Sequence, residues 1–230
     1  MTVASHALRP RVALVAGGAD GAGAATVRRL ALAGMHVVVA DVQDDRGESL
    51  ASQVGPQCSY LHASASSESD MRRAIAATLR RFGRIDCMVV DAGVPGPPLG
   101  ITATTPETWD AMLAVVLRSA YLGMHLAAQA MRAQPGGSII CTAAISGLRA
   151  GAGSPVASAA NAAVMQLTRS VALELGSAGV RVNCVCRERP DQGAEEAAAA
   201  IAWLASDAGA DVNGCVMVVG GAGPPVLGRI

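Results

Sequence analysis

Short apolar runs alternate with longer segments of helical spacing along most of the chain. The apolar runs predict buried strands at 11–16, 36–40, 58–62, 87–90, 138–142, 180–185 and 216–219. Between these runs, the spacing of apolar residues predicts helices over 22–33, 44–54, 68–82, 106–133, 155–176 and 194–205. Apolar strands separated by helices are typical of a parallel sheet covered on both faces. We therefore predict a doubly wound α/β fold with about seven strands.

The composition adds size, class and charge to this picture. The 230 residues are 51% hydrophobic and 16% charged, with no linker-like stretch, which predicts a single domain over 1–230. Eighteen basic residues balance eighteen acidic ones, and only five residues are aromatic, so we expect no nucleic-acid partner. We find no secretory signal and no uninterrupted apolar stretch of about 18 residues. A cytoplasmic protein with no membrane contact is predicted.

Two residue types limit the possible chemistry. All eighteen basic residues are arginine, so the chain has no lysine for a Schiff base or for lysine-assisted proton transfer. The six cysteines are scattered and show neither a CxxC pair nor zinc-ligand spacing. We expect these cysteines to be small buried side chains and predict no metal site.

A glycine-rich turn follows the first predicted strand. Gly17, Gly21 and Gly23 lie between that strand and its helix, and Asp41 ends the second strand. In such a turn the backbone approaches a pyrophosphate, and the acidic residue binds the adenosine ribose. This pattern favours dinucleotide binding. Alternatively, the glycines serve only the turn and the helix packing, because Asp20 places a carboxylate where phosphate would lie.

From about Arg11 to Gly221 the sequence resembles the short-chain dehydrogenase/reductase family. The resemblance is carried by the Gly17-x3-Gly21-x-Gly23 spacing and by four longer segments: DCMVVDAG (86–93), GSIICTAAISG (137–147), ASAANAAVMQLTRSVALELGSAGVRVN (157–183) and AIAWLASDAGADVNG (200–214). It implies a Rossmann-type sheet, a nicotinamide cofactor and hydride transfer assisted by a tyrosine, a lysine, a serine and an asparagine.

The chain departs from the family at each of those four catalytic positions. By the resemblance, the asparagine position is Val116, the serine is Ala144, and the tyrosine and lysine are Ala157 and Asn161. Alanine and valine carry no proton to transfer. The two tyrosines, Tyr60 and Tyr121, lie on other predicted elements. The usual family mechanism is therefore excluded.

The cofactor side departs from the family as well. The family's Asn-Asn-Ala-Gly begins here as Val90-Asp91, its adenine-contacting aspartate is Ser64, and its turn threonine is Ala16. The Pro-Gly after the sixth strand is Arg187-Glu188, and only 189–194 remain of the substrate lid. We expect NAD to bind weakly or not at all, with NAD preferred over NADP because Asp41 would repel a 2′-phosphate.

Other side chains at the predicted strand ends offer a replacement site. Asp91 and Ser146 could support acid–base chemistry, and Arg187 could hold an anion. The two long helices, 106–133 and 155–176, are alanine-rich on more than one face. In the family these helices form the main dimer interface. We therefore expect self-association, or pairing with an active paralogue, although plain alanine enrichment is an alternative.

Three functions remain open from the sequence. The first expectation is a non-catalytic structural or regulatory subunit that pairs with itself or with an active paralogue. The alternative is a redox-neutral cyclase, isomerase or lyase acting on a small molecule. The third is an NAD-dependent oxidoreductase of the usual family type.

Overall fold

The strands of the protein form one twisted sheet. The computed structural model describes residues 10–91, 96–134, 136–188, 193–221 and 226–228. The strand order is β3-β2-β1-β4-β5-β6-β7-β8, and the strands are β1 (Val12–Ala16), β2 (His36–Asp41), β3 (Cys58–His62), β4 (Cys87–Val90), β5 (Gly137–Ala144), β6 (Val180–Arg187), β7 (Val216–Val219) and β8 (Val226–Gly228). The first seven strands pair in parallel. The predicted doubly wound fold is confirmed.

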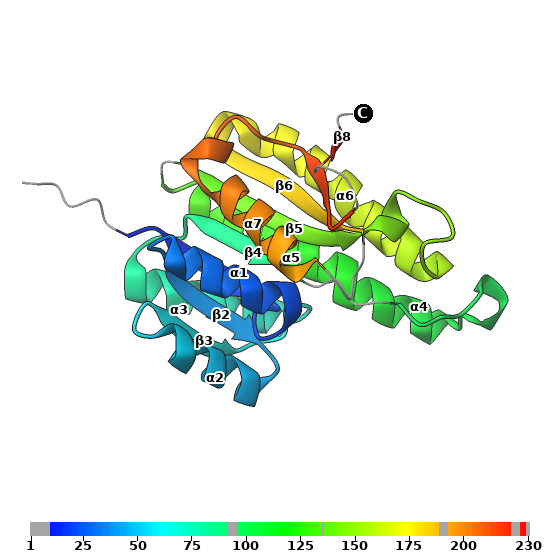
Figure 1. The fold of residues 1–230 in the computed structure, drawn as a ribbon, viewed down its shortest axis with the longest axis horizontal. Helices are drawn as coiled ribbons and strands as arrows, with labels where there is room; N and C mark the ends of the chain where they lie inside the picture. Colours follow the sequence, from blue (N-terminus) through cyan, green and yellow to red (C-terminus); the bar gives the residue numbers. More distant parts are fainter. Residues whose placement is uncertain (1–9, 92–95, 135, 189–192, 222–225, 229–230) are drawn as a thin grey trace, which may run out of the picture.

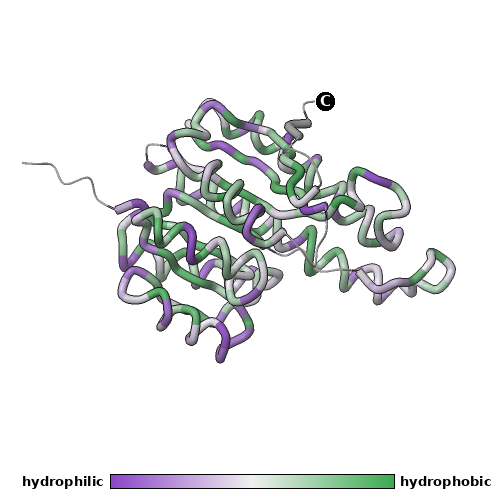
Figure 2. Tube along the Cα trace, viewed as in Figure 1, coloured by the Kyte–Doolittle hydropathy of each residue, from purple (hydrophilic) through white to green (hydrophobic). Residues whose placement is uncertain are grey.

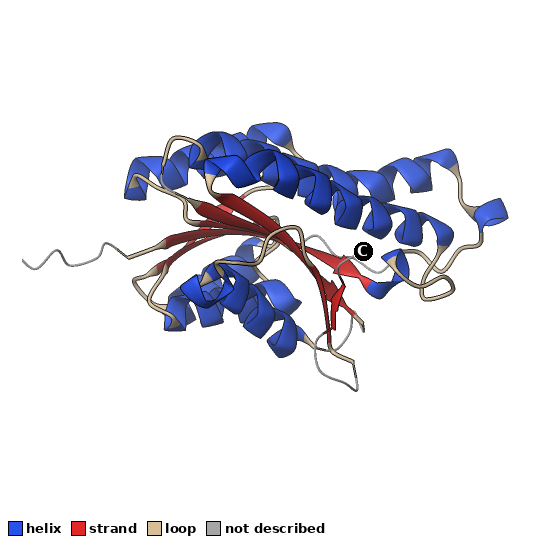
Figure 3. Ribbon diagram, turned by 90° about the horizontal axis from the view of Figure 1, so that it is seen from above, coloured by secondary structure: helices blue, strands red, loops and turns tan. Residues whose placement is uncertain are grey.

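Helices cover both faces of the sheet (Figures 1 and 3). One face carries α1 (Gly21–Leu32), α2 (Asp44–Val54) and α7 (Ala194–Ala205), and the other carries α3 (Glu68–Phe82), α4 (Pro106–Leu113), α5 (Ser119–Met131) and α6 (Pro155–Leu175). Short helical turns complete the described elements: η1 (Ile101–Ala103), η2 (Ala114–Arg118), η3 (Ile145–Gly147), η4 (Gly176–Ala178) and η5 (Asp207–Gly209).

The alternation of side chains along each strand separates two hydrophobic cores. In β1, Leu14 packs into the core under α3, α5 and α6, whereas Ala13 and Val15 pack into the core under α1 and α7. All five residues of β1 are buried. Figure 2 shows the hydrophobic strands running through the centre of the molecule. A strand buried on both faces reads as a continuous apolar run, which explains why these strands were predictable.

Two elements differ from the prediction. The helix predicted over 106–133 is interrupted by η2, a π-helical stretch. Such insertions occur mostly as single turns within α-helices. The second difference is β8, which adds an antiparallel edge strand beside β7. Its three residues are too few to give a periodic signal.

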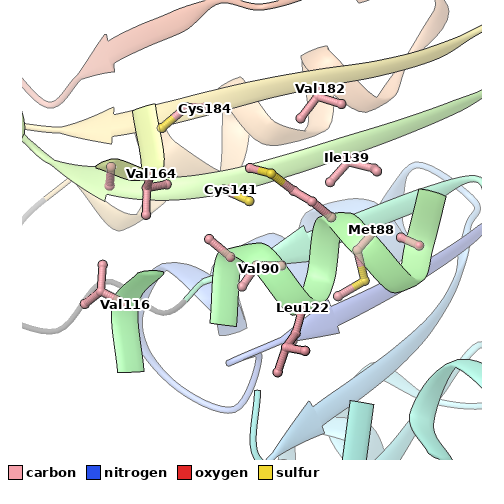
Figure 4. Packing of buried hydrophobic residues seen from close by; sticks show 14 of the residues in the cluster. Met88, Val90, Val116, Leu122, Ile139, Cys141, Val164, Val182 and Cys184 are labelled. Carbon is pink, nitrogen blue, oxygen red and sulfur yellow. The ribbon is translucent and has the colours of Figure 1, made fainter. Parts of the chain in front are cut away.

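Most of the long helix Pro106–Met131 belongs to the core. It is the one helix among the described residues that is long and apolar enough to cross a membrane, and 56% of its most apolar window is buried inside the protein. Val116 and Leu122 belong to the same hydrophobic core as Val90 and Val164 on this face of the sheet (Figure 4). Ala120, in the same helix, is also buried. The hydropathy of this helix is explained by its packing on the sheet.

Candidate functional site

An open cleft of about 470 Å³ lies beside the carboxyl ends of β1, β2 and β4. Open α/β sheets bind ligands at this edge, where the strand order reverses. Here the reversal falls between β1 and β4, because the chain runs outward from β1 to β3 and then returns to β4. The lining residues are Gly17, Asp20, Gly21, Ala22, Asp41, Val42, Gln43, Ala63, Ser64, Ala65, Ser66, Asp91, Val115, Ser119 and Arg187.

The glycine-rich turn forms one wall of the cleft. Gly17 has a φ of +78°, and a Cβ at this position would lie 2.0 Å from the backbone oxygen of Asp91. A Cβ on Gly23 would lie 2.0 Å from the oxygen of Gly17. Both positions therefore require glycine for close backbone contact. By contrast, a Cβ on Gly21 would meet no atom within 4 Å, so the backbone there is open to a ligand.

Asp41 ends β2 beside this turn. Its carboxylate accepts the N–H of Ala19 on the turn at 3.0 Å and the N–H of Gln43 at 3.1 Å. The side chain is buried, and the hydroxyl of Tyr60 donates to the backbone oxygen of Asp41 at 2.7 Å. These contacts fix the carboxylate at the edge of the cleft, where it can accept hydrogen bonds from a ribose.

The remaining carboxylate on the turn is that of Asp20. This residue is the N-cap of α1, and its side chain accepts the N–H of Gly21 at 2.8 Å. The guanidinium of Arg46, on α2, forms an ion pair with the same carboxylate. Sequence reasoning identified the negative charge of Asp20 but missed Arg46, which gave no motif signal.

A third acidic residue, Asp91, lies at the inner end of the cleft. The hydroxyl of Thr142, on β5, donates to the carboxylate of Asp91 at 2.6 Å. Burial raises the pKa of Asp91 above its ordinary value of 3.8, while the guanidinium of Arg187 and the Thr142 hydrogen bond act in the opposite direction. Arg187 ends β6 and is 9% exposed. The neighbouring strands β4, β5 and β6 thus bring together an acid that follows β4, a hydroxyl on β5 and a guanidinium cation at the end of β6.

Two of the three predicted replacement residues, Asp91 and Arg187, line this cleft. Ser146 is buried in η3. Its hydroxyl lies 3.5 Å from the side-chain nitrogen of Asn161. Thr142 contributes its hydroxyl to this group from β5. The predicted lid remnant, 189–194, falls mostly outside the described residues.

The four positions of the family tetrad lie on β5, α6 and η2. Val116 is buried in the hydrophobic core (Figure 4). Ala144 ends β5, and Ala157 and Asn161 lie one turn apart on α6. The side-chain oxygen of Asn161 accepts the N–H of Ala144 at 2.8 Å, and its nitrogen donates to the oxygen of Ala157 at 2.8 Å. Asn161 therefore connects two of the other positions by hydrogen bonds.

Known proteins resemble both the sequence and the fold. The chain is 41% identical to momilactone A synthase of Oryza sativa subsp. japonica over 76% of this chain and 65% of that protein. It is 38% identical to zerumbone synthase of Zingiber zerumbet, over 77% and 68% respectively. A solved short chain dehydrogenase from Mycobacterium smegmatis is 31% identical, with a TM-score of 0.86 over 94% of both chains.

These relatives correct the expected function. Two of them are named synthases and the third a short chain dehydrogenase. A further relative, (+)-borneol dehydrogenase 2 of Salvia officinalis, is 37% identical over 76% of this chain and 63% of that protein. The first expectation, a non-catalytic subunit, is therefore wrong: the relatives support an oxidoreductase instead. The chain spans 65% of momilactone A synthase and 54% of the maize protein tasselseed-2, the sex determination protein of Zea mays.

The family profile described as short chain dehydrogenase matches residues 11–189, which is most of the chain. Proteins of this family normally bind NAD or NADP, and the glycine turn and Asp41 lie on the wall of the cleft just described. The fold, the matched residues and the relatives lead to one conclusion: this chain belongs to the short-chain dehydrogenase/reductase family.

Proposed function

We propose that the protein is an NAD-linked oxidoreductase that interconverts an alcohol and a ketone at the cleft beside β1, β2 and β4. The observation that carries this proposal is the buried Asp41 carboxylate, held by the N–H of Ala19 at 3.0 Å on the wall of the cleft. A carboxylate at the end of the second strand, beside a glycine turn, is the ribose-binding arrangement of dinucleotide folds.

The residues present fit the adenosine side of a dinucleotide. Asp41 would hold the ribose hydroxyls, and the backbone from Gly17 to Gly23 would hold the pyrophosphate at the start of α1. A bound nicotinamide dinucleotide would supply or accept the hydride. Asp41 favours NAD over NADP, because it would repel a 2′-phosphate. We propose weak binding, with a Kd above about 1 µM, equivalent to about −8 kcal/mol.

Proton transfer needs a group other than the family tyrosine. Among the described residues that line the cleft, Asp91 is the acid whose pKa is raised by burial. We assign Asp91 the role of the general acid–base group. During oxidation its carboxylate accepts the proton of the substrate hydroxyl, and during reduction its carboxyl donates a proton to the carbonyl oxygen. Thr142 positions the carboxylate through its 2.6 Å hydrogen bond. A carboxyl with a raised pKa is better matched to this role near neutral pH.

The substrate class comes from the relatives. Two of them are named for borneol, an alcohol, which favours a small apolar alcohol or ketone for this chain. The chain covers 63% and 70% of these two proteins, so this assignment concerns the part of the site that the chain contains. A cytoplasmic location suits a nicotinamide-linked enzyme and remains a prediction.

Calorimetry and turnover test the proposal together. We expect NAD to bind the unmodified protein weakly, and Asp41→Asn to weaken it further. In turnover on a panel of small apolar alcohols, we expect Asp91→Asn to lower the rate about 100-fold, typical for loss of an acid–base group, without changing NAD affinity. Asp110→Asn, on exposed α4 surface, is the matched control. Absence of both NAD binding and NAD-linked turnover would overturn the proposal.

A further inference from the structure

The start of α1 already carries a negative charge of its own. The Asp20 carboxylate accepts the N–H of Gly21 at 2.8 Å, and the first turn of α1 has no other acidic residue. The N-terminus of a helix carries partial positive charge and unpaired N–H groups, and these are the features that bind a phosphate. Asp20 therefore occupies a position that a pyrophosphate would use.

Arg46 pairs with Asp20 from outside the turn. Its guanidinium, on α2, is paired with the Asp20 carboxylate. Both side chains are more than half exposed, at 58% for Arg46 and 64% for Asp20. Water and salt screen such a pair, so Arg46 offsets only part of the Asp20 charge.

The adenosine side of the cleft is built from other groups. Asp41 and Ser64 line it, and the Asp41 carboxylate is held by the backbone of Ala19 and Gln43. Ser64 is held by its own backbone N–H, which donates to Asp70 at 3.0 Å. None of these contacts involves the Asp20 side chain. The Asp20 charge therefore leaves the geometry of this half of the site unchanged for a ligand without phosphate.

We propose that Asp20 is a specificity-determining residue that competes with the ligand's pyrophosphate for the N-terminus of α1. This inference rests on the proposed function, because it concerns the same cleft. The competition makes the cleft discriminate by charge: each phosphate brought to the turn meets the Asp20 carboxylate, whereas a nucleoside does not. Arg46 offsets part of that charge through its ion pair with Asp20.

The test is calorimetry with three ligands: NAD, ADP and adenosine. In Asp20→Ser we expect NAD and ADP to bind about tenfold more tightly, within the range of charge effects at helix termini, and adenosine affinity to stay within about twofold. Serine preserves the helix cap, and a thermal melt checks that the variant folds. Asp45→Asn, an equal charge change on the first turn of α2, is the control. We expect it to change the affinities for all three ligands only slightly and by the same factor.

A second variant tests the role of Arg46. We expect Arg46→Gln to weaken NAD binding in the unmodified background, because it leaves the Asp20 charge without its partner. In the Asp20→Ser background the same change is expected to leave NAD affinity unaltered. A double-mutant cycle of these four proteins measures that coupling directly.

The outcomes separate this inference from the proposed function. If NAD binds but Asp20→Ser leaves its affinity unchanged, or tightens adenosine as much as NAD, the inference is overturned and the proposed function stands. Equal effects of Arg46→Gln in both backgrounds would also overturn it. If none of the three ligands binds any of the variants, the proposed function fails, and this inference fails with it.

Discussion

Asn161 connects helix α6 to the end of β5 through its side-chain amide. It accepts the N–H of Ala144 and donates to the oxygen of Ala157, and it is only 1% exposed. At the position that holds a lysine elsewhere in the family, this chain has a buried hydrogen-bonding residue. A lysine placed there would bring an ammonium group, which cannot accept the hydrogen bond from the N–H of Ala144.

The first prediction is that Asn161→Ala lowers the free energy of unfolding by about 1–3 kcal/mol, the usual cost of an unpaired buried polar group. Asn161→Lys is expected to cost more, because it buries a charge. Urea denaturation measures both variants, with Gln166→Ala on the exposed face of α6 as control. Unchanged stability of Asn161→Lys would show that this position is free to accept a lysine.

Glycine at position 23 is fixed by close packing. Because its Cβ would lie 2.0 Å from the oxygen of Gly17, we expect Gly23→Ala to force the turn apart and to cost more than about 2 kcal/mol of stability, well above the strain of a left-handed residue alone. Gly34→Ala is the comparison: Gly34 has a φ of +83° but no atom within 4 Å of its Cβ. Thermal denaturation of both variants checks the order, and equal losses would contradict it.

At the scale of elements, apolar runs located seven strands closely, since strands buried on both faces leave little room for polar residues. The sequence did not reveal the π-helical stretch η2 within the long helix. About one extra residue in one turn changes the spacing of apolar positions too little to be recognised in the sequence. In the cleft, Asp41 and the glycines were predictable from their place in the strand–turn–helix unit. Arg46 was not, since its partner Asp20 belongs to a different element and no motif marks the pair.

The start of α3 provides a pH prediction. The backbone N–H of Ser64 and the guanidinium of Arg73 lower the pKa of Asp70 from its ordinary value of 3.8. A lowered pKa in the folded state stabilises the protein above the ordinary pKa, and this contribution is lost as pH falls through the lowered value. We expect Asp70→Asn to reduce the loss of stability between about pH 5 and pH 3. Chemical denaturation at stepped pH measures this change, and identical pH profiles would contradict it.

At the scale of the whole molecule, the outward side of the long helices leaves apolar groups exposed. Tyr121 is 47% exposed and Leu173 is 86% exposed, and Leu167 lines two shallow grooves beside Tyr121. Exposed apolar patches of this kind mark interaction surfaces. Ala120, on the same helix as Tyr121, packs inside the core and does not belong to this surface.

We propose that a second copy of the chain covers this surface. Light scattering is expected to give twice the chain mass of 23.0 kDa, and Leu167→Arg is expected to halve that mass by placing an unpaired charge in the contact. Ser170→Arg, an exposed position on α6, is the control for the added charge. A monomeric mass for the unmodified protein would contradict this assembly.

Because every cysteine is buried, the native thiols can report local opening of the protein. All six thiols are buried, and burial raises the pKa of Cys87 and of Cys141 to about 12, so they stay protonated and unreactive in the closed protein. The thiols are distributed across the sheet, at Cys58 in β3, Cys87 in β4, Cys141 in β5, Cys184 and Cys186 in β6, and Cys215 next to β7. The rate at which an alkylating reagent modifies each thiol, followed by peptide mass spectrometry, would therefore rank the strands by how often each one opens locally. No engineered label is needed.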